Sequence, residues 1–259
     1  MSYRTILVTE DGGVRTITLN RPERRNAMTS EMQVELIAAM DEASASDCRV
    51  VVLRGAGEAF CAGLDLTALQ GMNDKTAAEC RADAERIAKL FRTWYELPKP
   101  TIAAVQGAAI AGGTGLATIC DFTLAVPAAT FGFTEVKIGF IPAVVSAFLA
   151  LQIGDKRARD LLLTGRLLDA AEAYRLGLVN EVVTPDHLEG RVRALAQALA
   201  GNSPASLAAT KQLLAAQNKA WLDSAIAQAM EANARARETA DFQEGIAAFL
   251  EKRKAKWTR

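Results

Sequence analysis

Residues 105–115 combine a short apolar strand, a glycine-rich turn and the expected start of a helix. Free N–H groups and the helix dipole at such a start favour a negatively polarised oxygen atom. Close packing between strand and helix also calls for glycine, and it explains Gly107 more readily than Gly112 and Gly113. The turn is therefore interpreted as a source of backbone hydrogen-bond donors.

Phosphate-binding loops share this strand–turn–helix plan, but the residues of the turn argue against one. Gly107 and Gly112 have the spacing of a nucleotide-binding P-loop, yet Gly113 stands where that loop needs a lysine. The G-x-G-x-x-G pattern of dinucleotide-binding turns is absent, and the run lies in the middle of the chain. Both phosphate-binding interpretations are set aside.

Two further segments supply candidate chemistry. Residues 59–66 form a glycine-containing loop directly after the apolar run 50–53. Residues 131–142 place Glu135 among apolar neighbours. A carboxylate in that setting is either paired with a cation, here Lys137, or kept as an acid/base with a raised pKa.

Composition excludes several other kinds of chemistry. Thirty Lys and Arg balance thirty Asp and Glu, so no global field favours nucleic acid or an anionic membrane. One histidine, His187 in an expected helix-opening turn, gives little basis for a zinc site or a Ser-His-Asp hydrolase. The cysteines are widely spaced and are expected to be reduced and buried: Cys48, Cys61, Cys80 and Cys120. Catalysis must then rely on carboxylates and the backbone.

No apolar run reaches the roughly 18 residues that a membrane span needs. The first residues also lack the apolar core of a signal peptide, so a cytoplasmic location is expected.

The elements that must position these segments alternate between strand and helix. Apolar runs predict strands at residues 5–9, 14–19, 50–53, 101–105, 122–126 and 179–183. Amphipathic and capped segments predict helices from residue 30 and at 76–96, 113–119, 143–153, 156–163 and 170–176, with an all-helical end. Ser30 and Gln33 are interpreted as a capping box, as are Asp169 and Glu172. This pattern predicts an α/β core with a C-terminal helical region.

Residues 21–28, 60–65, 107–121 and 131–142, in this order and spacing, resemble the crotonase superfamily of enoyl-CoA hydratases and isomerases. The resemblance covers essentially the whole chain. It implies a spiral of repeated β-β-α units over residues 1–200. Helices in residues 201–259 are then expected to assemble a homotrimer, often paired as a hexamer.

The resemblance also implies roles for individual residues. The N–H groups of Leu64 and Gly112 would form an oxyanion hole for a thioester carbonyl, and Glu135 would be the acid/base. Coenzyme A, as part of the substrate, would contact residues from two loops and from a C-terminal helix of a neighbouring subunit: Arg24, Arg25, Ala27, Ala62, Gly63, Asp65, Leu66, Phe249 and Lys252. No separate cofactor or metal is expected.

One departure from the family bears directly on the reaction. Typical hydratases of this family carry a second glutamate where this chain has Gly115, and the glycine-rich stretch after Pro142 is replaced by Ala-Val-Val-Ser. Residues 66–72, the helix after them and residues 143–148 are expected to line the acyl pocket. Hydration with Glu135 as single acid/base is favoured on overall similarity. A Δ3,Δ2-enoyl-CoA isomerase with Glu135 as proton shuttle and a non-catalytic acyl-CoA binder stay open.

Overall fold

The computed structural model describes residues 3–65, 68, 70–71 and 75–258. Its main sheet has the strand order β1-β2-β3-β4-β6-β9. β1 (Ile6–Asp11) and β2 (Val14–Leu19) form an antiparallel hairpin around Gly12 and Gly13, which both have positive φ. The remaining strands continue the sheet in parallel: β3 (Val50–Gly55), β4 (Thr101–Val105), β6 (Phe122–Ala125) and β9 (Glu181–Val182).

A second, smaller sheet gives the chain its spiral course. It contains β5 (Ala109–Ile110), β7 (Thr130–Gly132) and β8 (Leu168–Asp169), and Cys61 forms a parallel bridge with Ala109 at its edge. β4 therefore leads into β5 and α4, and β6 leads into β7 and η2, while β2 and β3 lead into the isolated bridges of Met28 and Cys61. This repeated unit confirms the predicted α/β spiral.

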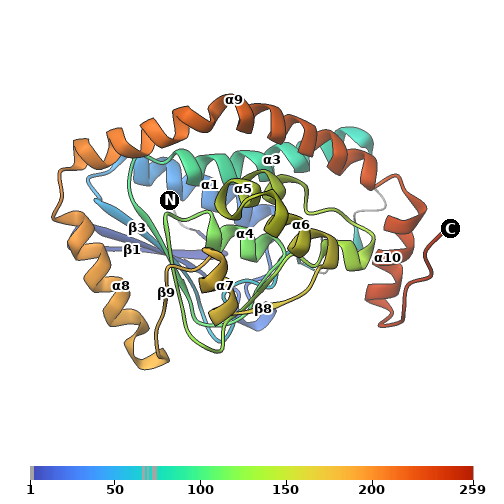
Figure 1. The fold of residues 1–259 in the computed structure, drawn as a ribbon, viewed down its shortest axis with the longest axis horizontal. Helices are drawn as coiled ribbons and strands as arrows, with labels where there is room; N and C mark the ends of the chain where they lie inside the picture. The colour runs from blue at the N-terminus through green and yellow to red at the C-terminus, as the bar shows by residue number, and fades with distance from the viewer. Residues whose placement is uncertain (1–2, 66–67, 69, 72–74, 259) are drawn as a thin grey trace.

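The helices cover the sheets on the outside (Figure 1). They are η1 (Pro22–Arg24), α1 (Ser30–Ala45), α3 (Ala77–Glu96), α4 (Gly112–Thr118), η2 (Glu135–Ile138), α5 (Ala143–Ile153), α6 (Asp155–Thr164), α7 (Ala170–Leu176), α8 (Pro185–Ala200), α9 (Pro204–Ala236) and α10 (Ala240–Leu250). None of the helices in the described ranges is long and apolar enough to cross a membrane.

Most of the predicted helix ends are confirmed by their caps. Thr76 and Glu79 form a capping box at the start of α3, Asp169 caps α7, and Gly177 ends α7 in the left-handed conformation. The capping box predicted at Ser30 is wrong. The hydroxyl of Thr29 accepts the Met32 N–H instead, so Thr29 caps α1 and Ser30 is its first residue.

The long helix α9 spans the molecule and contributes to the core. It packs against α3 and α5, and its Leu222, Ile226 and Ala229 are buried in the same apolar cluster as the sheet. The four cysteines are free and buried, as expected. α10 lies apart from this core, next to η2, near the C-terminal end of the chain in Figure 1. The division of the chain at residue 200 stays a prediction.

Candidate active site

A cavity of about 580 Å³ collects most of the predicted site residues. Its wall includes Arg24, Arg25, Ala27, Ala62, Leu64, Asp65, Gly112, Glu135 and Phe249. Gly63 and the exposed Lys252 are not among the described residues that line the cavity. Leu66 lies outside the described residues. As predicted, α3 and the start of α5 also contribute, through Ile87, Phe91 and Val144 among others.

Leu64 reaches the cavity through an extended segment paired with Met28. The Met28 N–H donates to the Gly63 carbonyl at 2.7 Å, and the Asp65 N–H donates to the Met28 carbonyl at 3.0 Å. Backbone groups of successive extended residues point to opposite sides, so the Leu64 N–H points away from Met28. Among the described residues, this N–H has no acceptor.

Gly112 presents a second uncommitted N–H group at the same cavity. It is the first residue of α4, and the first N–H groups of a helix have no acceptor within that helix. The preceding Ala111 has φ 53° and ψ −123°, a conformation that costs a non-glycine residue about 1–3 kcal/mol. Its N–H donates to the Gly132 carbonyl at 2.7 Å, which ties the strained turn to β7.

Glycines bring the Leu64 and Gly112 segments into backbone contact. A Cβ on Gly113 would lie 2.2 Å from the Cys61 carbonyl oxygen, and one on Gly107 would lie 1.9 Å from that of Glu58. Close packing therefore explains Gly113 as well as Gly107, contrary to the expectation from the sequence. At Gly112 a Cβ would meet only the flexible end of Met28, at 2.7 Å.

The loop before Ala27 is rigid because its polar groups are satisfied. Asn26 is buried with φ 54°; its side chain accepts the Arg21 N–H and donates to the carbonyls of Ala56 and Ala59. The Arg21 guanidinium also forms an ion pair with Asp65 at 2.9 Å. Arg24 and Arg25 at the cavity are thus held by a loop that is bonded to both neighbouring segments.

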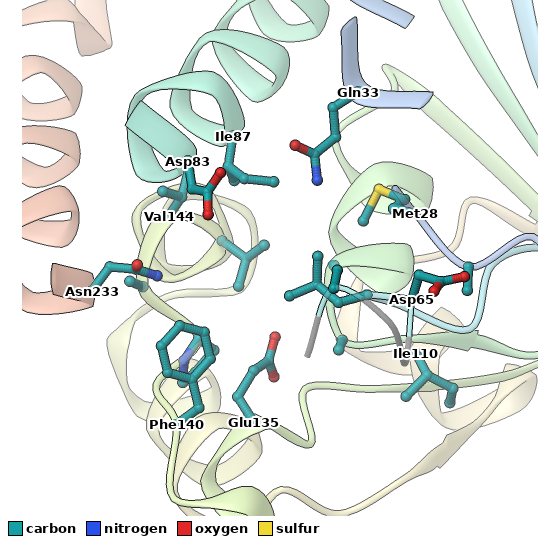
Figure 2. A pocket seen from close by; sticks show the side chains of 18 of the residues that line it. Met28, Gln33, Asp65, Asp83, Ile87, Ile110, Glu135, Phe140, Val144 and Asn233 are labelled. Atoms are coloured by element: carbon teal, nitrogen blue, oxygen red, sulfur yellow. The ribbon is translucent and has the colours of Figure 1, made fainter. Parts of the chain in front are cut away.

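Glu135 projects into the middle of the cavity from η2 (Figure 2). Its Oε2 is out of contact with solvent and has no hydrogen-bond partner among the described residues. Burial raises the pKa of Glu135 to about 7, and a hydrogen bond from its own N–H opposes this only in part. Of the two alternatives predicted for this carboxylate, the structure favours the acid/base with a raised pKa, because Oε2 has no partner and no ion pair joins Glu135 to Lys137 among the described residues.

The turn that carries Glu135 rests directly on α10 of the same chain. A Cβ on Gly139 would lie 2.1 Å from the Asp241 carbonyl oxygen, and a Cβ on Gly245 would lie 2.2 Å from that of Ile138. Phe140 and Phe242 pack beside these contacts in a tilted arrangement, with ring centroids 5.1 Å apart. Phe249 of α10 therefore lines the cavity of its own chain, whereas the resemblance implied a neighbouring subunit.

The space beside Gly115 is filled by apolar side chains. A Cβ on Gly115 would lie 2.6 Å from Val145 Cγ1 and 2.7 Å from Phe91 Cε1. The position of the family's second glutamate is thus closed by packing, and Glu135 faces an apolar wall on that side.

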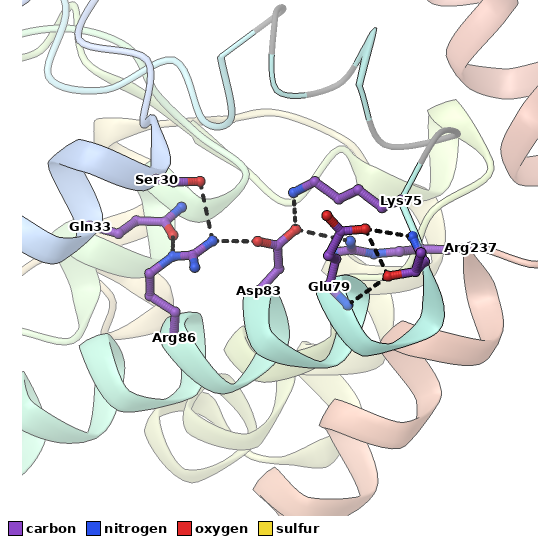
Figure 3. A network of polar contacts seen from close by, with 8 residues as sticks. Ser30, Gln33, Lys75, Glu79, Asp83, Arg86 and Arg237 are labelled. Atoms are coloured by element: carbon purple, nitrogen blue, oxygen red, sulfur yellow. Dashed lines mark hydrogen bonds and ion pairs between the residues drawn. The ribbon is translucent and has the colours of Figure 1, made fainter.

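A charged network at the cavity was not identified from the sequence. Asp83 of α3 pairs with Lys75, Arg86 and Arg237, and Arg86 also donates to Gln33 and Ser30 (Figure 3). The signal available in the sequence was the spacing of Asp83, Ile87 and Phe91, which places one charged residue on the apolar face of a helix. Nothing in the sequence pairs these residues with Arg237, which is far away along the chain.

Comparison with known proteins agrees with this geometry. The family model "Enoyl-CoA hydratase/isomerase" matches residues 9–259. A Thermus thermophilus protein named "Putative enoyl-CoA hydratase" is 46% identical over 245 residues, which cover 94% of this chain and 97% of that protein. A Clostridium acetobutylicum protein named "Short-chain-enoyl-CoA hydratase" is 34% identical over 98% of this chain and 97% of its own length.

Solved structures give the same result for the fold. An enoyl-CoA hydratase/isomerase from Xanthobacter autotrophicus Py2 superposes with a TM-score of 0.90 at 33% identity, over 100% of both chains. An enoyl-CoA hydratase from Mycobacterium avium subsp. paratuberculosis K-10 gives a TM-score of 0.88 at 30% identity, again over 100% of both chains. The chain therefore belongs to the enoyl-CoA hydratase/isomerase family, and it has the crotonase fold.

Proposed function

We propose that this protein is an enoyl-CoA hydratase that works with a single carboxylate, Glu135. The observation that carries the proposal is the half-buried Glu135 carboxylate, whose Oε2 is buried without a partner, in a cavity with two uncommitted backbone donors, Leu64 and Gly112. The names of the relatives support the hydratase assignment.

The two backbone donors suit a thioester carbonyl oxygen. When a nucleophile adds at C3 of a 2-enoyl thioester, negative charge moves to that oxygen and an enolate forms. Donors fixed in place by backbone packing stabilise this charge without reorganising, and one such donor is worth about 3–4 kcal/mol in a site that excludes water. The strained Ala111 and the close contact at Gly113 support such fixed positions.

Glu135 would move the proton. As a carboxylate it orients a water molecule and takes a proton from it while the water oxygen bonds to C3. The protonated Glu135 then delivers the proton to C2, so that the product is a 3-hydroxyacyl thioester and the carboxylate is restored. A pKa near 7 suits a group that must both accept and release a proton at neutral pH.

The closed space beside Gly115 supports a second candidate, a Δ3,Δ2-enoyl-CoA isomerase. Isomerisation moves one proton between C4 and C2 through a dienolate, whose charge also lies on the thioester oxygen, and it needs neither a bound water nor a second carboxylate. Phe91 and Val145 fill the position where a second acid/base group would stand.

Two parallel assays separate these candidates. With crotonyl-CoA a hydratase removes the absorbance of the conjugated enoyl thioester, whereas with 3-hexenoyl-CoA an isomerase creates it. Loss of signal in the first assay with no gain in the second supports hydration, and the reverse result supports isomerisation. If both assays stay blank while titration shows thioester binding, the protein is a non-catalytic acyl-CoA binder.

Contacts to coenzyme A are part of the same proposal. Arg24, Arg25, Ala27, Ala62 and Asp65 line the cavity from loops on one side, and Phe249 closes it from α10. Lys252, exposed beyond the end of α10, is proposed as a partner for a CoA phosphate, and assembly into trimers or hexamers also remains a proposal. Replacing Lys252 with Ala should then raise KM with little change in kcat.

A further inference from the structure

Among the described residues, the charged network at the cavity contains more positive than negative groups. Lys75, Arg86 and Arg237 all pair with Asp83. Burial alone would raise the pKa of Asp83, but hydrogen bonds and charge from Lys75 and Arg86 outweigh burial and lower that pKa. Glu79, a second carboxylate of this network, is exposed; it forms the capping box of α3 with Thr76 and also interacts electrostatically with Lys75. Three cations therefore share one ionised, partly buried carboxylate.

Both oxygens of Asp83 already accept hydrogen bonds, and one donor of its partners, the Nε of Arg237, lacks an acceptor among the described residues. Oδ1 accepts from Arg86, and Oδ2 accepts from Lys75 and Arg237. The Arg237 side chain is only 7% exposed, yet its buried Nε has no acceptor among the described residues. One turn earlier on α9, Asn233 also lines the cavity and has a buried Oδ1 without a donor. Buried charged donors without acceptors are costly, so the arrangement is incomplete as it stands.

Asp83 lies on the side of the cavity opposite Asp65 and the loops proposed to hold coenzyme A, while Arg86 reaches back to Ser30 and Gln33 at the start of α1. Figure 2 shows Asp83 and Asn233 on one side, Met28 and Asp65 on the other, and Glu135 between them. Along α3 the cavity wall runs from Phe91, which touches the Gly115 region, through Ile87 to Asp83. At 1.5 Å per residue this places Asp83 about 12 Å along the helix from Phe91. The wall is thus apolar beside the reacting carbons and cationic beyond them.

We infer that Arg86, Arg237 and Lys75 recognise a carboxylate at the far end of the acyl group, so that the substrate is the CoA thioester of a dicarboxylic acid. The inference rests on the proposed function, in which the acyl group occupies this cavity. A terminal carboxylate would accept from these guanidinium and ammonium groups and balance the excess positive charge. The cation–π contact of Arg237 with Phe140, at 5.7 Å, keeps that guanidinium at the cavity wall.

Matched pairs of saturated thioesters test the inference without requiring turnover. Succinyl-CoA is paired with 4-methylpentanoyl-CoA, glutaryl-CoA with 5-methylhexanoyl-CoA, and adipyl-CoA with 6-methylheptanoyl-CoA. Within each pair an uncharged isopropyl group replaces the carboxylate at equal chain length. Calorimetric titration of the whole protein should show tighter binding of the charged member, by about tenfold or more, in at least one pair.

Variants locate the source of that preference. Arg86→Gln and Arg237→Gln should each reduce the preference for the charged member at least about fivefold, since each removes a charge-assisted contact. Arg92→Gln is the matched control: Arg92 lies on the same helix and pairs with Glu96 and Asp223, but it is not among the described residues of the cavity wall. The Arg92→Gln variant should keep the wild-type preference for the charged thioester.

Each other outcome contradicts the inference. Equal or tighter binding of the uncharged member in all pairs overturns it. If Arg86→Gln and Arg237→Gln weaken both members of a pair equally, the cations act on the nucleotide end or on folding, and the acyl assignment is wrong. If no CoA thioester binds at all, the proposed function fails first, which is a distinct result.

Discussion

The ring of Phe91 occupies the space directly in front of Gly115, where a Cβ atom would lie 2.7 Å from Phe91 Cε1. Phe91 is 1% exposed and stacks on Phe148 with ring centroids 6.0 Å apart, so it has little freedom to withdraw. The glutamate is therefore not only replaced by glycine. The side chains of Phe91 and Val145 also fill the space that a glutamate side chain would need. The packing around Gly115 therefore distinguishes this chain from an enzyme that carries two carboxylates in its site.

Introducing a glutamate at position 115, with no other change, should destabilise the protein and should not increase its hydration rate. Gly115→Glu would force a side chain against Phe91 and Val145 and bury an unpaired carboxylate. We expect a loss of about 1–3 kcal/mol or more in the free energy of unfolding, measured by urea denaturation, with no gain in hydration rate. Combining it with Phe91→Ala should cost less than the sum of the two single changes, because the smaller side chain makes room. Strict additivity would show that Phe91 does not block the site.

Glu135 should control the pH dependence of turnover. The carboxylate is the form that accepts a proton in both hydration and isomerisation, so kcat/KM should rise with pH and level off above a midpoint near 7. Glu135→Gln should lower kcat by about 10²–10⁴-fold and remove this limb, while thioester binding stays largely intact. Stopped assays between pH 5 and 9 measure both effects. An unchanged limb in the variant would assign the titration to another group.

The same carboxyl group should make stability depend on pH. Its pKa is about 7 in the folded chain and near 4.5 when unfolded, so the folded state holds the proton between these values. The associated stability is fully present below about pH 4.5 and is lost as pH rises through 7. Glu135→Gln cannot lose stability in this way. The free energy of unfolding of the variant minus that of the wild type should therefore be up to about 3 kcal/mol larger above pH 8 than at pH 4.5. Parallel denaturant titrations at the two pH values test it, and a constant difference would refute the buried, unpaired state of Glu135.

Much of this fold could be predicted because local signals and global packing agree. The capping box of Thr76 and the left-handed Gly177 mark helix ends that depend on neighbouring residues alone. Thr29 shows the limit of such signals: two hydroxyl residues are adjacent, and because Thr29 is the cap, the capping-box position falls on Met32, while Gln33 accepts from Arg86.

The site also contains residues that the sequence predicts and residues that only the structure shows. Glu135, Leu64 and Gly112 lie in recognisable segments, and the structure brings all three to one cavity. The charged network around Asp83 could not be predicted, because its residues come from α1, α3 and the end of α9 and meet only through their side chains. Likewise, no sequence pattern shows that Gly245 touches the turn of Glu135, since that contact depends on where α10 docks.

The contact between the two donor-bearing segments gives a prediction about Gly113. Gly113→Ala would place a Cβ 2.2 Å from the Cys61 carbonyl oxygen, which is backbone and cannot move alone. We expect a loss of about 1–3 kcal/mol in unfolding free energy and weaker thioester binding, because the Leu64 and Gly112 donors would separate. Gly190→Ala in α8 is the control, because it meets no atom within 4 Å and should gain up to about 1 kcal/mol. Similar stabilities for the two variants would contradict this role of Gly113.

Gly245 should influence catalysis although it is not among the described residues of the cavity wall. A Cβ at this position would lie 2.2 Å from the Ile138 carbonyl oxygen, so Gly245→Ala must push α10 away from the turn that carries Glu135. Small displacements of a catalytic group can cost up to about 10²-fold in rate, so kcat should fall at least about tenfold. Water would also reach the loosened carboxylate, and the midpoint of the pH–rate limb should move below 7. A purely structural loss would lower the amount of folded enzyme without moving that midpoint, which separates the two explanations. The Gly190→Ala protein again serves as the control, and an unmoved midpoint in Gly245→Ala would show that α10 does not set the environment of Glu135.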